Sequence, residues 1–448
     1  MATLTIALLS PITARAESAP NLTRSASVEH REASETRNQK VGDVPADFES
    51  VPSTASTAPQ SNCAETKRNL ESLRKAGQKK AVCLEWQTPQ EYAKTRGVSA
   101  QSAANVVWCS EQPQNETYVE RTSICSVRGV VIVVMDTVTG MIYGKAYGTV
   151  EQEIDTQNSI PEFFEYMNFS LYASDVTSSA MTVSVTPVCS LDTSCKQNAG
   201  AWAAPRPITV GGSLDGTISR SWTGTSGRKS FLISYSLTVN IGGASGTTRW
   251  GGNGEPGGGQ YLVRCDNEVT ARRGCIVPSY TPTFVVDPKY RQARSFIGMA
   301  QASMASHPGW EGKGQPLHRE ANESEVNKNR AVVCDSTFTP SSSTPEPQCD
   351  EFPFARSKES GRQLGVQSGI ECQRYNVVSS TVNGQVYLSL TWPGLQQGQM
   401  PSPTAKCARA SMPKTQNEGV GGDLGRRTAE WRLLENDAYW VDAGQPVG

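Results

Sequence analysis

The chain has 448 residues, of which 37% are hydrophobic and 39 are glycines. This length and composition exclude a mini-protein and a wholly disordered chain, and no apolar run is long enough to span a membrane. The formal net charge of −1 excludes a strong overall positive field, so an anionic partner must be held by local contacts.

The chain begins with features of an export signal. Residues 4–12 form a short apolar stretch, and residues 14–16 read Ala-Arg-Ala, which fits a signal-peptidase site. We therefore predict a signal peptide at residues 1–16. Residues 17–62 are rich in Ser, Thr, Ala, Pro and charge, which predicts a disordered linker or pro-segment.

The next segment, residues 63–105, opens with helical spacing. Leu70 and Leu73 recur among several Lys and Arg residues between Cys63 and Cys83. We predict a short helical segment, interpret its basic run as a solvated helix face and assign it no function.

Residues 106–262 alternate between apolar and polar positions. The period-two or strand-like runs are residues 130–135, 141–147, 181–185 and 231–239. A turn signal, Thr139-Gly140, separates the first two runs. Short strands at this spacing predict an N-terminal antiparallel β-sandwich-like module. The segment holds no histidine, so it offers no evident catalytic constellation.

A glycine-rich stretch ends this module. Residues 252–257 match the GxGxxG pattern of dinucleotide-binding loops. Pro256 and the glycines that follow it disfavour the helix that such a loop must open. We interpret the stretch as a boundary loop.

The twelve cysteines indicate disulfides. None forms a CxxC pair and the chain has only three histidines, which disfavours structural zinc. An even number of spread cysteines predicts disulfides and a secreted, extracellular protein. The local pairs that we expect are Cys189–Cys195, Cys265–Cys275 and Cys334–Cys349. The last of these would close a 16-residue loop beside Asp350, which stabilises a fold by about 3 kcal/mol in the chain-entropy account.

The remaining residues, 263–448, mix helical and strand patterns. Residues 290–306 have helical spacing. Two strand-like runs, 375–378 and 386–390, flank an Asn383-Gly384 hairpin signal. The polar, glycine-rich block 417–424 precedes a helix that we predict over residues 426–434.

Two adjacent carboxylates stand out in this region. Residues 349–355 read Cys-Asp-Glu-Phe-Pro-Phe-Ala, with Asp350 and Glu351 side by side. Neighbours on a strand point to opposite faces, so only one of the two can enter a given site. They are therefore not the facing carboxyl pair of a glycosidase.

This motif resembles the Asp-Glu-Tyr/Trp-Pro-Phe/Met-Ala signature of the NucA/NucB family of secreted bacterial deoxyribonucleases, with Phe352 in place of the Tyr or Trp. The resemblance covers about residues 262–442. Further similar blocks are residues 316–319, Asn329-Arg330, Lys358-Glu359, residues 417–424 and residues 436–441. It implies a C-terminal α+β domain of the ββα-metal nuclease type, a divalent cation (Mg²⁺ or Mn²⁺) and hydrolysis of DNA.

The resemblance also implies roles for particular residues. Asp350 would be the base, and Glu351 would bind metal or orient it, with the two roles exchangeable. Asn417 would be a metal ligand and Glu359 a weaker metal candidate. The candidates for contact with DNA are Arg374, which we place on a strand, and His318 with Arg319.

We therefore expect a secreted, metal-dependent and largely sequence-nonspecific DNA endonuclease. One alternative is a noncatalytic extracellular protein in which the β-sandwich binds a partner and the C-terminal region is a scaffold. Another is a delivered nuclease toxin, which would have an immunity protein as its partner.

Overall fold

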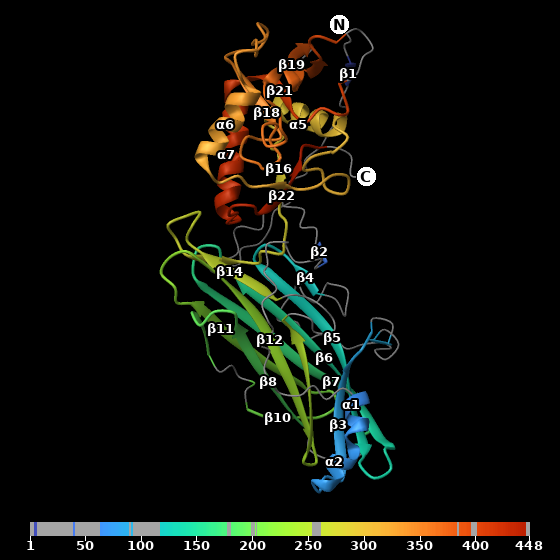
Figure 1. Ribbon diagram of the computed structural model, residues 1–448. Coiled ribbons are helices and arrows are strands. Elements are labelled where there is room, and N and C mark those ends of the chain that lie inside the picture. The colour runs from blue at the N-terminus through green and yellow to red at the C-terminus, as the bar shows by residue number, and fades with distance from the viewer. Residues whose placement is uncertain are drawn as a thin grey trace, which may run out of the picture. The chain divides into compact units, whose positions relative to one another are not determined.

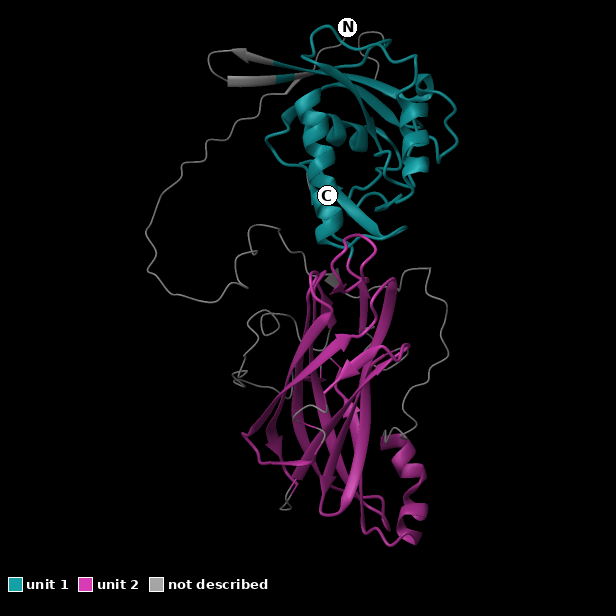
Figure 2. Cartoon of the chain, turned by 90° about the vertical axis from the view of Figure 1, so that its left-hand side faces the viewer, with its two compact units in different colours: residues 1–36, 281–448 teal, residues 37–280 magenta. Residues whose placement is uncertain are grey.

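The computed structural model describes residues 4–6, 39–40, 63–88, 91–92, 117–176, 181–198, 202, 204–252, 261–382, 385–395 and 401–444. It has two compact units (Figure 2): unit 1 comprises residues 1–36 and 281–448, and unit 2 comprises residues 37–280. The division lies later in the chain than the boundary predicted at residue 262. The reason is a hairpin of β14 (Leu262–Asp266) and β15 (Gly274–Ile276), which extends a sheet of unit 2.

Unit 2 consists of two antiparallel sheets, in agreement with the predicted β-rich module (Figure 1). The first has the spatial order β2 (Gln39–Lys40), β4 (Thr117–Val119), β5 (Ser123–Asp136), β6 (Ile142–Thr156), β7 (Glu162–Ser174), β11 (Ser213–Trp222) and β9 (Cys195–Gln197), and β3 (Lys80–Trp86) also pairs with β5. The second has the order β10 (Arg206–Ile208), β8 (Met181–Ser190), β12 (Arg228–Ile241), β14 and β15, and β13 (Ala244–Gly251) also pairs with β12.

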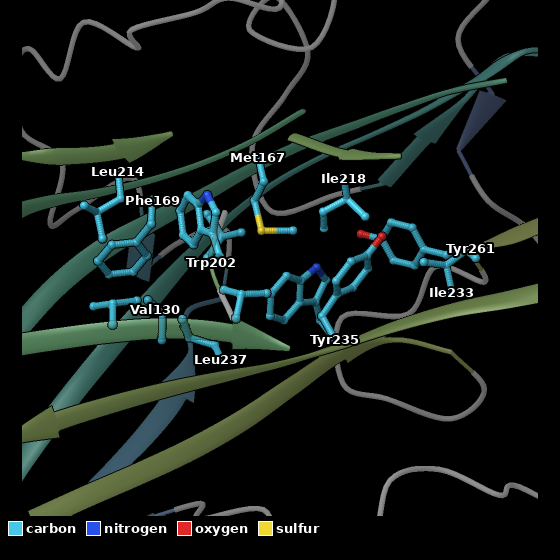
Figure 3. Close-up of a cluster of buried hydrophobic side chains, with 14 of the residues drawn as sticks. Val130, Met167, Phe169, Trp202, Leu214, Ile218, Ile233, Tyr235, Leu237 and Tyr261 are labelled. Carbon is cyan, nitrogen blue, oxygen red and sulfur yellow. The ribbon is translucent and has the colours of Figure 1, made fainter. Parts of the chain in front are cut away.

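One hydrophobic core joins the two sheets of unit 2. It contains Ile132 and Phe169 from the first sheet and Tyr235 and Val239 from the second, all of them buried. Figure 3 shows Met167, Trp202 and other large side chains of this core. The alternation predicted along residues 231–239 thus marks the inward face of β12.

The helical prediction for residues 63–105 holds only at its start. Helices α1 (Cys63–Arg68) and α2 (Leu70–Lys75) are followed by β3, whose sequence Lys-Ala-Val-Cys-Leu-Glu-Trp pairs with β5 along its whole length. A disulfide ties Cys63 of α1 to Cys83 of β3. Residues 93–105 lie outside the described part of the chain.

Unit 1 is built around a five-stranded sheet. Its order is β1 (Leu4–Ile6), β20 (Gln385–Thr391), β19 (Gln373–Val382), β21 (Ala408–Pro413) and β18 (Pro347–Phe352), with β19 and β21 parallel and the other pairs antiparallel. A smaller sheet has the order β16 (Thr283–Val285), β22 (Ala438–Asp442) and β17 (Leu317–His318).

Three helices of unit 1 accompany the larger sheet: α5 (Arg291–Ser303), α6 (Glu323–Val333) and α7 (Lys414–Glu430). A short 3₁₀ helix spans Gly369–Glu371. The predicted helix over 290–306 corresponds to α5. The helix predicted over 426–434 is wrong in position, because the glycine-rich block 417–424 lies inside α7. Val420 and Leu424 bury their side chains in the core of unit 1, which outweighs the low helix propensity of the glycines.

The three local disulfides predicted from the sequence are confirmed, and Cys63–Cys83 and Cys372–Cys407 are also present. Strands β19 and β20 pair as predicted, but their Asn383-Gly384 turn lies outside the described residues. The predicted linker 17–62, apart from β2, also lies outside the described residues. The same holds for Pro256 of the rejected GxGxxG match. Of the predicted signal peptide, Leu4–Ile6 is described and pairs with β20. No helix among the described residues is long and apolar enough to cross a membrane.

Candidate functional site around Asp350

Strand β18 sets the directions of the two adjacent carboxylates. It pairs with β21 so that Asp350 lies opposite Ala410 and Glu351 lies opposite Arg409. Ala410 belongs to the hydrophobic core, whereas Arg409 hydrogen-bonds to the carbonyl of Val333 at the end of α6. Directly paired residues share a face of the sheet, so Asp350 and Glu351 point to opposite faces.

Asp350 is buried on the face that packs against the core. It is 7% exposed, and its Oδ1 accepts a hydrogen bond of 2.9 Å from the backbone N–H of Glu351. Burial, helped by the charge of Glu351, raises the pKa of Asp350 to about 8. This carboxylate therefore binds a proton far more strongly than an exposed aspartate does.

Glu351 is equally buried but faces α6. Its Oε1 lies 3.5 Å from Nε of Arg330, and its neighbour Cys349 is bonded to Cys334 at the end of that helix. Burial raises the pKa of Glu351, and the Arg330 guanidinium opposes this effect. The side chain is therefore committed to an ion pair on the face away from Asp350.

Asn417 lies on the same side of β18 as Asp350. It sits in the first turns of α7, and its Nδ2 donates to Oε1 of Gln348 at 2.9 Å and to the carbonyl of Cys349 at 3.4 Å. Gln348 and Asp350 share a face because they are two residues apart on the strand. Asn417 therefore contacts Gln348 and Cys349 beside the acidic motif, and its role as a metal ligand together with Asp350 stays a prediction.

The structure also joins two predicted residues whose sequence positions give no hint of contact. Nδ1 of His318, on β17, lies 2.8 Å from Oε1 of Glu359, and the backbone N–H of His318 donates to Oε2 of Glu359 at 2.8 Å. The side chain of His318 is 40% exposed. Glu359 therefore orients the imidazole, which is the arrangement of a supported histidine base.

Arg319 and Arg374 serve local structure in unit 1. The guanidinium of Arg319 donates to the carbonyl of Leu433, and burial lowers the pKa of Arg319. Arg374 donates to the carbonyl of Thr339 and lies over the ring of Phe338. Arg374 is beside Arg409 on the Glu351 face of the sheet, so the structure does not bring it to Asp350.

The described residues around Asp350 offer few oxygen or nitrogen ligands for a metal ion. Within the part of the chain that the structure describes, no three His, Cys, Asp or Glu side chains gather closely enough to hold a metal ion. Asn417 uses its amide nitrogen for both of its hydrogen bonds, and its Oδ1 accepts none from the described residues. Amide and carboxyl oxygens as ligands suit Mg²⁺ or Mn²⁺, which retain several water ligands, better than zinc.

Sequence reasoning identified most of these residues but not their pairing. It treated His318 and Glu359 as separate candidates, and it did not identify Arg330 as the counterion of Glu351. The alternation along a strand was the one signal that separated the two acids.

No protein-family model matches the chain, and a search of curated proteins finds no match.

Proposed function

We propose that unit 1 is a divalent-metal-dependent endonuclease that hydrolyses phosphodiester bonds of DNA. The observation that carries the proposal is the buried carboxyl of Asp350, whose pKa is raised to about 8. Strongly perturbed acids are typical of sites that transfer protons. Strand β18 pairs with β21, which leads directly into α7; this grouping of two strands and a helix, with β19 and β20 inserted between the two strands in the chain, supports the ββα-metal nuclease type.

In the proposed reaction, the ionised form of Asp350, which prevails above about pH 8, accepts the proton of the attacking water. A base works best when its pKa lies near the working pH, so we expect the reaction to be fastest in mildly alkaline solution. Glu351 positions rather than reacts, since it anchors β18 to Arg330 on the opposite face. The backbone N–H of Glu351 fixes the Asp350 carboxyl through its hydrogen bond.

Asn417 would hold the cation through Oδ1, with Gln348 and Cys349 fixing its amide nitrogen. When bound, Mg²⁺ or Mn²⁺ would neutralise negative charge that develops on the phosphate and the leaving oxygen. DNA would be held mainly by this cation and by a few local contacts, because the chain carries a net charge of only −1.

We also propose that the protein is exported. The five disulfides of the described residues support an oxidising compartment.

The proposal is tested by the rate at which the full chain nicks supercoiled plasmid in Mg²⁺ or Mn²⁺. We expect Asp350→Asn to lower the rate at least about 100-fold, the usual contribution of a general base. Glu351→Gln is the matched control, because this acid is adjacent and equally buried but faces α6. It should lose far less activity. Equal rates for the wild type and Asp350→Asn would refute the role of Asp350.

His318→Ala separates the two possible bases. Its nicking rate should stay within about tenfold of the wild type if Asp350 takes the proton. A large loss in His318→Ala together with a normal rate in Asp350→Asn would move the role of base to the pair of His318 and Glu359. No nicking by the wild type at any metal concentration would instead favour the noncatalytic binding protein.

A further inference from the structure

The hairpin between β5 and β6 exposes a group of apolar side chains at its tip. Val138 is 73% exposed, Met141 70%, Ile142 47% and Tyr143 55%. These residues lie within six positions of one another and form the most concentrated set of exposed large apolar side chains among the described residues. We call this group, Val138 and Met141–Tyr143, the apolar tip. A group of exposed apolar side chains commonly marks an interaction surface.

The turn that carries the apolar tip is ordered by its own hydrogen bonds. Asp136 Oδ1 accepts from the backbone N–H groups of Val138 and Thr139, and its Oδ2 accepts from the hydroxyl of Tyr143 at 2.7 Å. The hydrogen bond with Tyr143 contributes most to lowering the pKa of Asp136 to about 2. Gly140 supplies a positive φ of 70° at the turn. The apolar side chains are therefore held outward on a preformed hairpin.

A segment rich in basic residues lies beside the apolar tip. Residues 63–80, which contain α1 and α2, hold six Lys and Arg against two Glu. Lys79 and Lys80 join α2 to β3, and the carbonyl of Lys79 accepts from Thr137 N–H. The ammonium of Lys80 lies 5.5 Å from the centre of the Tyr143 ring. Leu70 of α2 lies next to Gly140, so helix and hairpin form one surface.

Few acidic side chains balance this basic segment. Glu71 pairs with Lys75 at 3.0 Å, and Asp136 is occupied by the turn. Arg68, Arg74 and Lys79 are exposed. The surface thus combines apolar side chains, which can enter a lipid layer, with Lys and Arg side chains, whose charged ends can stay in the water beside the lipid headgroups. This combination is typical of a protein that lies on a lipid interface.

We propose that the apolar tip and the basic residues of α1 and α2 dock unit 2 onto anionic phospholipid membranes. The apolar side chains would enter the headgroup region, and the lysines and arginines would contact phosphate groups. This inference is independent of the proposed nuclease activity. It replaces the interpretation of the basic run as a merely solvated helix face.

The test is sedimentation of the full chain with two kinds of vesicle. One kind contains phosphatidylcholine alone, and the other contains phosphatidylcholine with about 30% phosphatidylglycerol, an anionic lipid that attracts basic segments. We expect binding to the anionic vesicles only. The double variant Val138→Ser/Met141→Ser should weaken it at least about tenfold, because two exposed apolar side chains no longer leave water. Arg74→Glu/Lys79→Glu should weaken it about 30-fold or more.

Two control variants make the same kinds of substitution, an apolar residue to Ser and a basic residue to Glu, elsewhere in unit 2. Val210→Ser removes a side chain that is 55% exposed between β10 and β11, and Arg228→Glu reverses an exposed charge at the start of β12. Both should bind vesicles like the wild type. The proposal is overturned if anionic vesicles do not bind, or if the controls lose as much binding as the tip variants. It is also overturned if the basic residues bind duplex DNA while Val138→Ser/Met141→Ser leaves vesicle binding unchanged.

Discussion

Asp350 is costly for the stability of unit 1 at neutral pH. Its pKa is about 8 in the folded protein, whereas an unperturbed aspartate has a pKa of 3.8. Below pH 4 both the folded and unfolded chains carry the proton. Between pH 4 and 8 only the folded chain retains it, so the free energy of unfolding decreases as the pH rises, and above pH 8 it levels off. A residue kept at such a cost is typical of a functional site.

Asp350→Asn should therefore stabilise unit 1 at high pH. The variant retains the shape of the side chain but cannot ionise, so at pH 8.5 its free energy of unfolding should exceed that of the wild type. The upper limit is about 6 kcal/mol, at 1.36 kcal/mol per pKa unit. The difference should disappear near pH 4. Urea unfolding at the two pH values measures it, and an equal or lower stability of the variant at pH 8.5 would contradict the burial account.

The glycines of α7 differ in what surrounds them. A Cβ on Gly421 or Gly425 would meet nothing within 4 Å, whereas on Gly419 it would lie 2.3 Å from the ring of Tyr290. Gly421→Ala and Gly425→Ala should each raise the free energy of unfolding by about 0.5 to 1 kcal/mol, because alanine is the better helix former. Gly419→Ala should lower it. Thermal unfolding of the three variants checks the prediction, and stabilisation by Gly419→Ala would be inconsistent with the packing of α7 against the start of α5.

The disulfide Cys334–Cys349 joins the end of α6 to β18, with 15 residues of sequence separation. Replacing both cysteines by alanine should lower the free energy of unfolding by about 3 kcal/mol, as expected for a loop of this length. It should also lower nicking activity, since β18 positions Asp350. The variant Cys189→Ala/Cys195→Ala, in unit 2, is the control that should leave nicking unchanged. Unchanged stability after loss of Cys334–Cys349 would show that β18 is held by other contacts.

Local patterns predicted much of the fold, and long-range contacts account for most of what they missed. The alternation along β12, the turn at Gly140 and the short-range disulfides depend on residues close in sequence. The faces of Asp350 and Glu351 followed from strand geometry alone. The contact of His318 with Glu359 spans 41 positions. Burial of Val420 and Leu424 sets the position of α7. The low helix propensity of the glycine-rich block gives no indication of this burial.

Unit 2 encloses an ion pair in its core. Arg220 Nη1 lies 2.5 Å from Oε2 of Glu165, and both side chains are fully buried. Gln152 donates to Glu165 at 2.6 Å and accepts from the indole of Trp250 at 2.8 Å, so the pair belongs to a hydrogen-bonded chain across the core.

Breaking this buried pair should destabilise unit 2 strongly. Glu165→Gln leaves the Arg220 guanidinium without its counterion, which costs about 3 to 5 kcal/mol in comparable cases. Glu71→Gln, which breaks the exposed pair with Lys75, is the control and should leave the unfolding midpoint unchanged. Denaturant unfolding followed by tryptophan fluorescence provides the measurement. A Glu165→Gln protein as stable as the wild type would mean that the core tolerates the unpaired charge.

The proposed activity depends on the ability of unit 1 to cut DNA with a cation beside Asp350. The most direct measurement is nicking of supercoiled plasmid by the purified full chain while Mg²⁺ is titrated, withdrawn with EDTA and restored. We predict a rate that saturates with Mg²⁺, disappears in EDTA and returns when Mg²⁺ is added in excess. In the same titration, Asn417→Ala should require more Mg²⁺ than the control Thr415→Ala. A rate that is unaffected by EDTA, or no cutting at any Mg²⁺ concentration, would contradict the proposed mechanism.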